Sequence, residues 1–471
     1  MKKLNELSRR NFLGQVSCAA IGYSTLYSSL INLKAFSAAA IANSTVAASD
    51  DYKALVCIFQ GGGNDSFNML MPRTTAEYNA YAQTRSNLAI PREDILAINA
   101  ANQPGREFGV HPGMPAVQNL FDDGKMAFVS NVGTLLRPTD KDNYNDYSNL
   151  PLGLYSHSDQ TQQWQTGISN ARTAKGWGGK VADLINDMNT SEDISMNVSL
   201  SGTNVFQTGN QTVEYAIDAE SGSVGIYGHG PTQPWDVFNR VRTTAIDSML
   251  DHQYQDVFRQ TYVDVIRRSR DAHIQFQAAL EEVPEFQTQF SDNELSQSFK
   301  MTARTMAARE ALGMRRQIFF MDYHGWDHHD ELIGNQEEML PVLATALSEF
   351  QAVMEELGLS ECVTTFSISE FGRTLTSNGN GTDHAWGGNV MVMGGSVKGG
   401  NIFGDYPDLA LDAPRLVSDG VVIPDLSADQ YFAELALWFG VSPSDLDTIF
   451  PNLSEFYDTS SSELPIGFLN V

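Results

Sequence analysis

Short runs of apolar and β-branched residues recur along the chain between longer stretches of mixed polarity. Six runs have the length and continuous apolar character of strands that are buried on both faces. They cover residues 54–59, 126–132, 196–200, 317–321, 362–368 and 389–393. Because helical patterns lie between them, we predict an α/β fold with three layers, in which helices cover both faces of a mainly parallel central sheet.

Two longer stretches have the spacing of helices. After Asp330, apolar residues recur every three or four positions and predict a helix against the sheet, with Pro341 in its first turn or at a kink. Residues 236–280 are more polar, and we predict a helical insertion that packs on the main domain. The apolar face of this insertion would consist of Phe238, Val241, Tyr254, Val257, Phe258, Tyr262, Val265 and Ile266.

The first forty residues have the features of an export signal. Arg9 and Arg10 precede a weakly apolar stretch, and small residues follow at 35–40. The apolar stretch is too polar for a stable membrane span. We therefore predict a twin-arginine signal over residues 1–40, a linker over 41–51 and one folded domain over 52–471, in a periplasmic or extracellular protein. An amphipathic first helix of the fold is the alternative.

Composition and charge narrow the function further. The chain has 471 residues, of which 42% are hydrophobic, so it can form a large core. The formal net charge of -27 argues against binding to nucleic acid, because the phosphate backbone would be repelled. Outside the signal only Cys57 and Cys362 remain, and both lie in apolar runs. Buried thiols are favoured there, with a disulfide between them as the alternative.

Polar clusters follow three of the predicted strands. Residues 60–66 form a glycine-rich turn that ends with Asp65 and Ser66, residues 322–330 hold three histidines and three aspartates, and residues 367–388 follow the third strand. Ligands bind beyond the carboxyl ends of parallel strands, so the clusters predict a divalent metal site built from distant segments. The ion could be Zn²⁺, Mn²⁺, Ca²⁺ or Mg²⁺. A fourth segment places His157 at the start of a helix that Ser156 would cap.

Taken in order, these motifs resemble those of a twin-arginine-exported bacterial family, the domain of unknown function 1501. That family is related to the alkaline phosphatase and sulfatase superfamily, and the resemblance spans about residues 55–456. The matching segments are GGND at 62–65, FGVHP at 108–112, SH at 156–157, WQTG at 164–167, GWDHH at 325–329, SEFGRT at 369–374, DHAWGG at 383–388 and FPNL at 450–453.

The resemblance implies an alkaline phosphatase-like fold and a role for each candidate site residue. The implied metal ligands are Asp65, Asp327, His329, Glu370 and His384. The implied catalytic residues are His157, Ser158 and Ser66, as nucleophile or general acid, and Arg373, which would neutralise charge on the transferred group. Phe371 stands where the superfamily usually has a second histidine ligand, which argues against a complete second metal site.

Three functions are compatible with this reading. The first is an exported metal-dependent hydrolase that acts on phosphate or sulfate esters of a small molecule or a polysaccharide. The second is a non-catalytic envelope protein that keeps the fold and binds a co-exported partner. A glycosidase ranks last, because it requires two carboxylates at a defined separation, which the sequence does not reveal.

Overall fold

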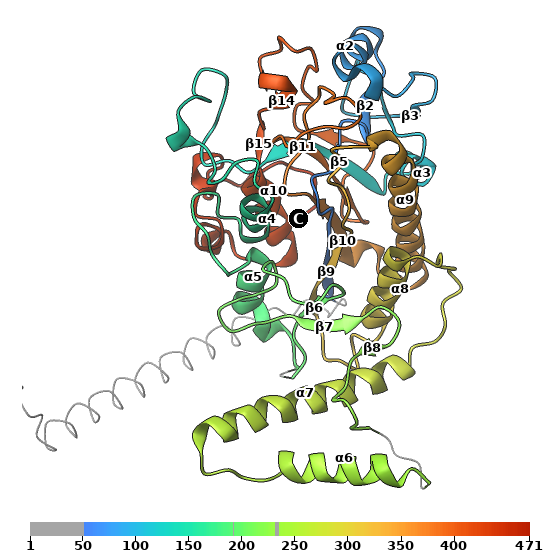
Figure 1. Ribbon diagram of the computed structural model, residues 1–471, viewed down its shortest axis with the longest axis vertical. Helices are drawn as coiled ribbons and strands as arrows, with labels where there is room; N and C mark the ends of the chain where they lie inside the picture. The colour runs from blue at the N-terminus through green and yellow to red at the C-terminus, as the bar shows by residue number, and fades with distance from the viewer. Residues whose placement is uncertain (1–50, 192, 231–234) are drawn as a thin grey trace, which may run out of the picture. The chain divides into compact units, whose positions relative to one another are not determined.

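The centre of the fold is a mixed ten-stranded sheet built around β1 (Lys53–Phe59). Figure 1 shows this sheet with helices on either side of it. β1 pairs in parallel with β9 (Arg316–Asp322) on one side and with β10 (Val363–Ile368) on the other. The strand order is β12-β5-β11-β10-β1-β9-β6-β7-β8, and β15 also pairs with β5. The remaining strands are β5 (Met126–Gly133), β6 (Asn197–Ser199), β7 (Tyr215–Asp218), β8 (Gly222–Ser223), β11 (Gly388–Met393), β12 (Ile402–Phe403) and β15 (Leu426–Ser427).

This computed structural model describes residues 51–191, 193–230 and 235–471. Within that range Tyr52–Val471 forms one compact unit. The predicted export signal over residues 1–40 and residues 41–50 of the predicted linker lie outside the described residues. No helix in the described part of the chain combines the length and the apolar character that crossing a membrane requires.

Alternate residues of β1 pack into two separate cores, one on each face of the sheet. The face that carries Val56 is covered by α8 (Glu294–Ala307) and α9 (Leu332–Glu356). The face that carries Leu55 is covered by α4 (His157–Thr166), α5 (Trp177–Ile185) and α10 (Ala428–Phe439). Each of the six predicted runs contains a strand of this sheet, and the predicted α/β fold is confirmed.

Two details refine the expectation. β11 runs antiparallel to both of its neighbours, β10 and β5, so the mainly parallel sheet is mixed. Pro341 lies inside α9, which excludes the first turn; the alternative of a kink stays a prediction. The smaller elements are α2 (Thr75–Arg85), α3 (Pro115–Asp122), α11 (Leu446–Ile449), a sheet of β2 (Leu70–Pro72), β4 (Phe108–Val110) and β3 (Leu96–Ile98), and a pair of β13 (Leu416–Val417) and β14 (Val421–Val422).

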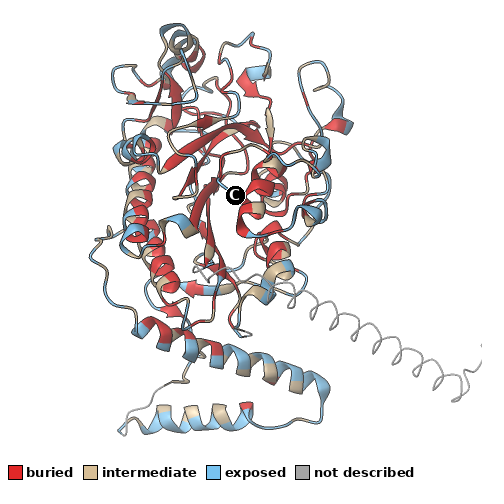
Figure 2. Ribbon diagram, turned by 180° about the vertical axis from the view of Figure 1, so that it is seen from behind, coloured by how far each residue is buried: buried red, intermediate tan, exposed pale blue. Residues whose placement is uncertain are grey.

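The predicted insertion contains two helices, α6 (Val237–Leu250) and α7 (Val257–Glu281). The carboxyl-terminal part of α7 packs on the main core through Ala272 and Phe276. α6 and the first half of α7 are largely exposed, as Figure 2 shows. Most of the predicted apolar face therefore does not pack on the main domain, and side chains such as Phe238 and Phe258 are exposed.

Of the cysteines in the described part of the chain, Cys57 is buried within β1 and Cys362 directly precedes β10. The two are not joined by a disulfide. Burial raises the pKa of the Cys57 thiol well above its ordinary value, so the thiolate is disfavoured.

Candidate metal centre

The polar clusters meet beyond the carboxyl ends of β1, β9 and β10. These three strands are parallel neighbours, so the segments that follow them emerge at one edge of the sheet. The segment after β9 carries Asp327 and the segment after β10 carries Glu370. His384 lies just before the antiparallel strand β11, and His157 is the first residue of α4.

The glycine-rich turn after β1 supports the segment that carries Asp327. The Gly61 carbonyl accepts hydrogen bonds from the backbone N–H groups of Gly325 (3.0 Å) and Trp326 (3.1 Å). Gly62 has φ of 123°, and a Cβ atom there would lie 2.4 Å from the Asp327 nitrogen. Only glycine permits this conformation and this close approach.

Arg373 joins three segments of the site from a fully buried position. Its guanidinium donates to the carbonyls of Gly62 (2.7 Å), Gly63 (2.8 Å) and Thr382 (2.7 Å), and also to the carboxylate of Asp327. Burial raises the pKa of Asp327, but the hydrogen bond and charge of Arg373 outweigh it and hold that pKa below its ordinary value. The carboxylate is therefore kept ionised and fixed in place.

Three imidazoles have their Nδ1 atoms held by acceptors. Nδ1 of His157 lies 2.8 Å from a Glu370 carboxylate oxygen, and Nδ1 of His384 lies 2.9 Å from the Tyr155 carbonyl. Nδ1 of His329 lies 3.1 Å from a carboxylate oxygen of Asp383. Ionised carboxylates and carbonyls only accept, so each Nδ1 carries the proton and donates it. In a neutral ring this leaves the lone pair on Nε2.

The three Nε2 atoms converge on the carboxylate of Asp327. They lie 3.4 Å (His157), 3.2 Å (His329) and 3.4 Å (His384) from its oxygens. Nε2 of His329 and Nε2 of His384 are only 2.9 Å apart. If both rings are neutral and protonated on Nδ1, their Nε2 lone pairs point at each other and repel at this distance. A cation bound by both nitrogen atoms would remove this repulsion.

The donor set therefore fits a divalent metal ion. The donor atoms of His157, Asp327 and His384 all lie within 4.8 Å of one another. Nε2 of His157 and Oε2 of Glu370 are buried and lack a hydrogen-bond partner in the described structure. Imidazoles whose Nδ1 donates to a carboxylate or a carbonyl are typical of metal sites, because that hydrogen bond orients the ring.

The rings are also packed against one another. Phe371 stacks on His384 with centroids 4.6 Å apart and lies 4.8 Å from the ring of His157. The hydrogen bond that His157 donates to Glu370 raises the pKa of His157, against the effect of burial. Burial lowers the pKa of His384.

The cluster opens into a cleft of about 530 Å³. Ser158 is exposed in it, next to His157, whereas Asp322 and His324 form part of the wall near the end of β9. The cleft is lined by Phe59, Gly62, His157, Ser158, Thr161, Gln162, Gln165, Val205, Asp322, His324, Asp327 and Glu370.

The structure brings together four of the five residues predicted as metal ligands. Asp327 and His384 belong to the donor cluster with His157, and Nε2 of His329 lies beside it, 2.9 Å from Nε2 of His384. Glu370 contacts the cluster by orienting His157. The carboxylate of Asp65 is instead engaged by the Arg85 guanidinium at 2.7 Å, and both side chains are fully buried.

The predicted catalytic residues are placed differently from one another. His157 joins the metal donors, and Ser158 is the exposed hydroxyl beside it. Ser66 is buried, and its hydroxyl accepts a hydrogen bond from the Asn389 backbone at 2.7 Å. Arg373 is also buried and positions Asp327, so neither Ser66 nor Arg373 is exposed to an incoming ester.

Sequence reasoning missed two partners of the imidazoles. Asp383 directly precedes His384, and a carboxylate beside a candidate ligand was a usable signal. The second partner is the carbonyl of Tyr155, a residue with φ of 71°. Backbone groups carry no sequence signal, so this contact appears only in the structure.

Fold and site together define an α/β protein with a histidine and carboxylate cluster at the carboxyl edge of a mixed sheet. The chain belongs to the family described as protein of unknown function (DUF1501), whose model matches residues 52–433. No curated protein matches the sequence.

Solved structures that resemble the chain include Ps i-CgsB in complex with k-i-k-neocarrahexaose, with 8% identity over 88% of this chain and 78% of that one, and a TM-score of 0.33. The PsFucS1 sulfatase from Pseudoalteromonas sp. has 6% identity over 83% and 68%, with a TM-score of 0.33. A mutant of the alkaline phosphatase PafA has 9% identity over 69% and 63%, with a TM-score of 0.28. At such identities the site residues of those structures do not transfer to this chain.

Proposed function

We propose that this protein is exported by the twin-arginine route and acts as a metal-dependent hydrolase on phosphate or sulfate esters. The observation that carries the proposal is the convergence of three Nε2 atoms on Asp327, each ring held through Nδ1. His157, Asp327 and His384 would hold one divalent cation, with His329 beside them. When bound, such a cation polarises an ester oxygen and stabilises the charge that develops on it.

The other residues keep this arrangement in place. Glu370 and Asp383 orient the rings of His157 and His329, and Arg373 fixes the carboxylate of Asp327. Since these groups are set by the fold before a substrate enters, little reorganisation is required during reaction.

The start of α4 supports an anionic substrate. Its first residue, His157, faces the cleft, and helix amino termini attract anions through their unpaired N–H groups and dipole. Ser158 provides a hydroxyl at the same place, and we propose it as the nucleophile.

The first test is metal content. We expect the purified protein to hold about one equivalent of a divalent cation by elemental analysis. His157→Ala and His384→Ala should lose it, and Glu370→Gln, which weakens the hydrogen bond that orients the ring of His157, should lower metal affinity by roughly 10- to 100-fold. His252→Ala removes an exposed imidazole of the insertion and should leave metal content unchanged. Metal-free wild-type protein that binds no added cation would refute the site.

The second test is turnover. We expect metal-dependent release from a panel of aryl phosphate and aryl sulfate esters, lost on chelation and restored by the added cation. Ser158→Ala should abolish turnover while leaving metal content unchanged, because its hydroxyl is not among the metal donors.

A non-catalytic envelope protein is the second candidate. It is favoured by the burial of Ser66, whose hydroxyl accepts from the Asn389 backbone, and by the contact of the Ser158 hydroxyl with Ser156 at 3.2 Å. Neither of these two predicted nucleophiles is hydrogen-bonded to a general base among the described residues. Metal binding without turnover on any ester would support this candidate over the hydrolase.

A further inference from the structure

The insertion carries a large exposed apolar surface, which we call the hairpin face. It consists of Phe238, Val241 and Met249 on α6 and of Phe258, Tyr262 and Val265 on α7. Phe258 is 87% exposed and Phe238 is 73% exposed. Soluble monomers rarely expose contiguous apolar patches of this kind without a partner.

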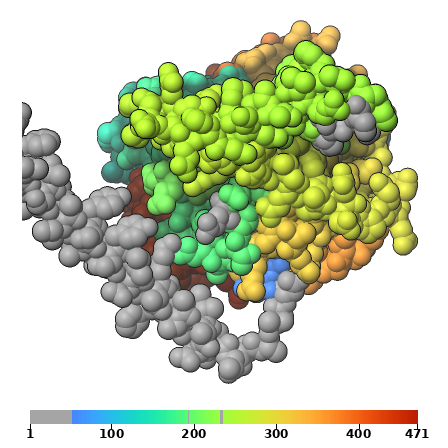
Figure 3. All heavy atoms as spheres, turned by 90° about the horizontal axis from the view of Figure 1, so that it is seen from below, coloured from blue at the N-terminus to red at the C-terminus, as the bar shows by residue number. Residues whose placement is uncertain are grey.

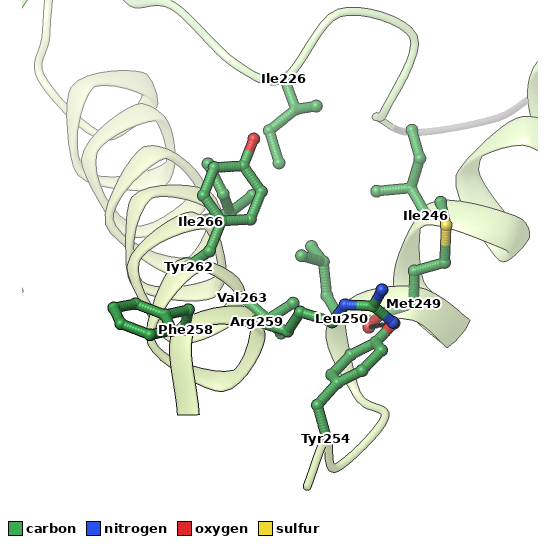
Figure 4. A pocket seen from close by; sticks show the side chains of 10 residues that line it. All are labelled: Ile226, Ile246, Met249, Leu250, Tyr254, Phe258, Arg259, Tyr262, Val263 and Ile266. Carbon is green, nitrogen blue, oxygen red and sulfur yellow. Dashed lines mark hydrogen bonds between the residues drawn. The ribbon is translucent and has the colours of Figure 1, made fainter. Parts of the chain in front are cut away.

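The hairpin face includes an open apolar groove between the two helices. Figure 4 shows Ile246 and Met249 of α6 facing Tyr262 and Ile266 of α7 across it. The groove measures about 520 Å³. In Figure 3 the helices lie at the front of the view, and other described segments do not cover them there.

Charge on the insertion contrasts with charge on the rest of the chain. Residues 236–280 hold six Asp and six Arg, whereas the whole chain has a net charge of -27. Several of these charges are paired within the hairpin: Arg270 lies 3.2 Å from Asp247, and Arg267 lies 2.9 Å from Asp264. Two copies of this acidic chain would therefore repel each other least through the insertion.

We propose that two copies of this chain associate through the hairpin face and form a four-helix arrangement. A two-fold interface requires a surface that is complementary to itself. The hairpin face meets this requirement, because it presents both exposed aromatic rings and an apolar groove that can receive them. Side chains of Arg267 and Arg270 hold α6 against α7, so each copy presents the surface already formed.

The hairpin face supplies much of the area that a stable dimer buries. Its three aromatic side chains, Phe238, Phe258 and Tyr262, are on average about three-quarters exposed. At roughly 150–250 Å² for an aromatic side chain, they offer roughly 450 Å² of surface. A standard interface buries about 800 Å² on each partner, so the aromatic rings alone supply more than half of it, and Val241, Met249 and Val265 add to them.

The test is the mass of the purified protein in solution, measured by sedimentation velocity over a dilution series. We expect a dimer for the wild type. The double variant Phe238→Asp, Phe258→Asp should raise the dissociation constant by at least about 30-fold, because two exposed aromatic anchors are replaced by charge. Val265→Asp should weaken the dimer in the same direction. Tyr147→Asp, which changes an exposed tyrosine outside the insertion, should leave the dimer intact.

The substituted side chains are exposed, so the hairpin variants should keep the wild-type circular dichroism spectrum and metal content, whereas their unfolding temperature should fall because association no longer stabilises the fold. A wild type that is monomeric at every concentration would overturn the proposal. The same holds if that monomer binds anionic lipid vesicles or another protein through the hairpin face. A dimer that survives both hairpin variants would overturn it as well.

Discussion

Asp65 and Arg85 form a buried ion pair in which neither side chain is exposed. The sequence suggested a metal ligand at Asp65, because the residue follows a strand and a glycine-rich turn. The sequence contained no indication that the guanidinium of Arg85, on α2, would contact the Asp65 carboxylate. A carboxylate that is committed to an arginine contributes to the fold, and its removal would leave the arginine charge unpaired in the core.

Replacing Asp65 by Asn should therefore lower the free energy of unfolding by about 3–5 kcal/mol, measured by chemical denaturation. Metal content of the folded variant should equal that of the wild type. As a matched control, Glu107→Gln removes one partner of the exposed pair with Arg92 and should change stability by less than about 1 kcal/mol. Loss of metal from folded Asp65→Asn protein would restore Asp65 as a ligand.

At this scale the residue types were predictable and their roles were not. Asp327, His329 and His384 were recognisable because histidines and carboxylates cluster after predicted strands. Whether a residue contacts the metal or orients another residue depends on differences of a few ångströms. Glu370 was predicted as a ligand, which stays a prediction: one of its carboxylate oxygens accepts the hydrogen bond that orients His157, and the other lacks a hydrogen-bond partner in the described structure. No pattern of residue types contains this distinction.

Among the elements, the strands of the central sheet were the most predictable. Their apolar runs are continuous because both faces of the sheet are covered, and each predicted run contains a strand. The insertion was less predictable for a physical reason. An apolar stripe on a helix indicates that the stripe is to be buried, but it does not indicate whether the covering surface belongs to the same domain or to another molecule.

α10 contains a titratable group that should make stability depend on pH. Asp429 is fully buried, and burial raises its pKa from 3.8 to about 8, against the opposing charge of Lys180. Between these two values the folded state retains a proton that the unfolded state releases. The free energy of unfolding should therefore fall as pH rises through this window, by up to about 1.4 kcal/mol per pH unit.

Asp429→Asn should remove this dependence, because the amide does not ionise. We expect the stability of the wild type relative to the variant to decline by about 2 kcal/mol between about pH 5 and pH 7. Denaturation curves of both proteins at each pH measure this difference, and other titrating groups cancel in the comparison. If the free energies of unfolding of wild type and variant change in parallel with pH over the whole window, Asp429 is ionised in the folded protein.

For the molecule as a whole, excess negative charge is the dominant electrostatic property. The 57 acidic residues outnumber the 30 basic ones, and repulsion among them acts against the compact state. Sequence composition predicts this property fully. Overall composition does not predict that residues 236–280 carry equal numbers of aspartate and arginine on two largely exposed helices. This local charge balance lowers the repulsion between two copies that associate through these helices.

Salt should therefore stabilise the monomer unit. Raising sodium chloride from a few millimolar to about 0.5 M shortens the screening length to a few ångströms and should raise the unfolding temperature by a few degrees. Potassium chloride at equal ionic strength should give the same shift, which separates screening from specific ion binding. An unfolding temperature that is unchanged or falls in both salts would contradict this expectation.

The pairing of β1 has a consequence for the time at which the fold can form. During synthesis this central strand leaves the ribosome early, yet its neighbours β9 and β10 are translated much later, since Ala54 pairs with Gln317 and with Val363. The nascent chain must therefore hold an unpaired apolar strand until most of the protein has been made, and contacts this distant along the chain form slowly. A chain terminated before β10 would lack one partner of β1 and the whole segment that carries Glu370 and His384, so the centre can assemble only after synthesis has passed His384.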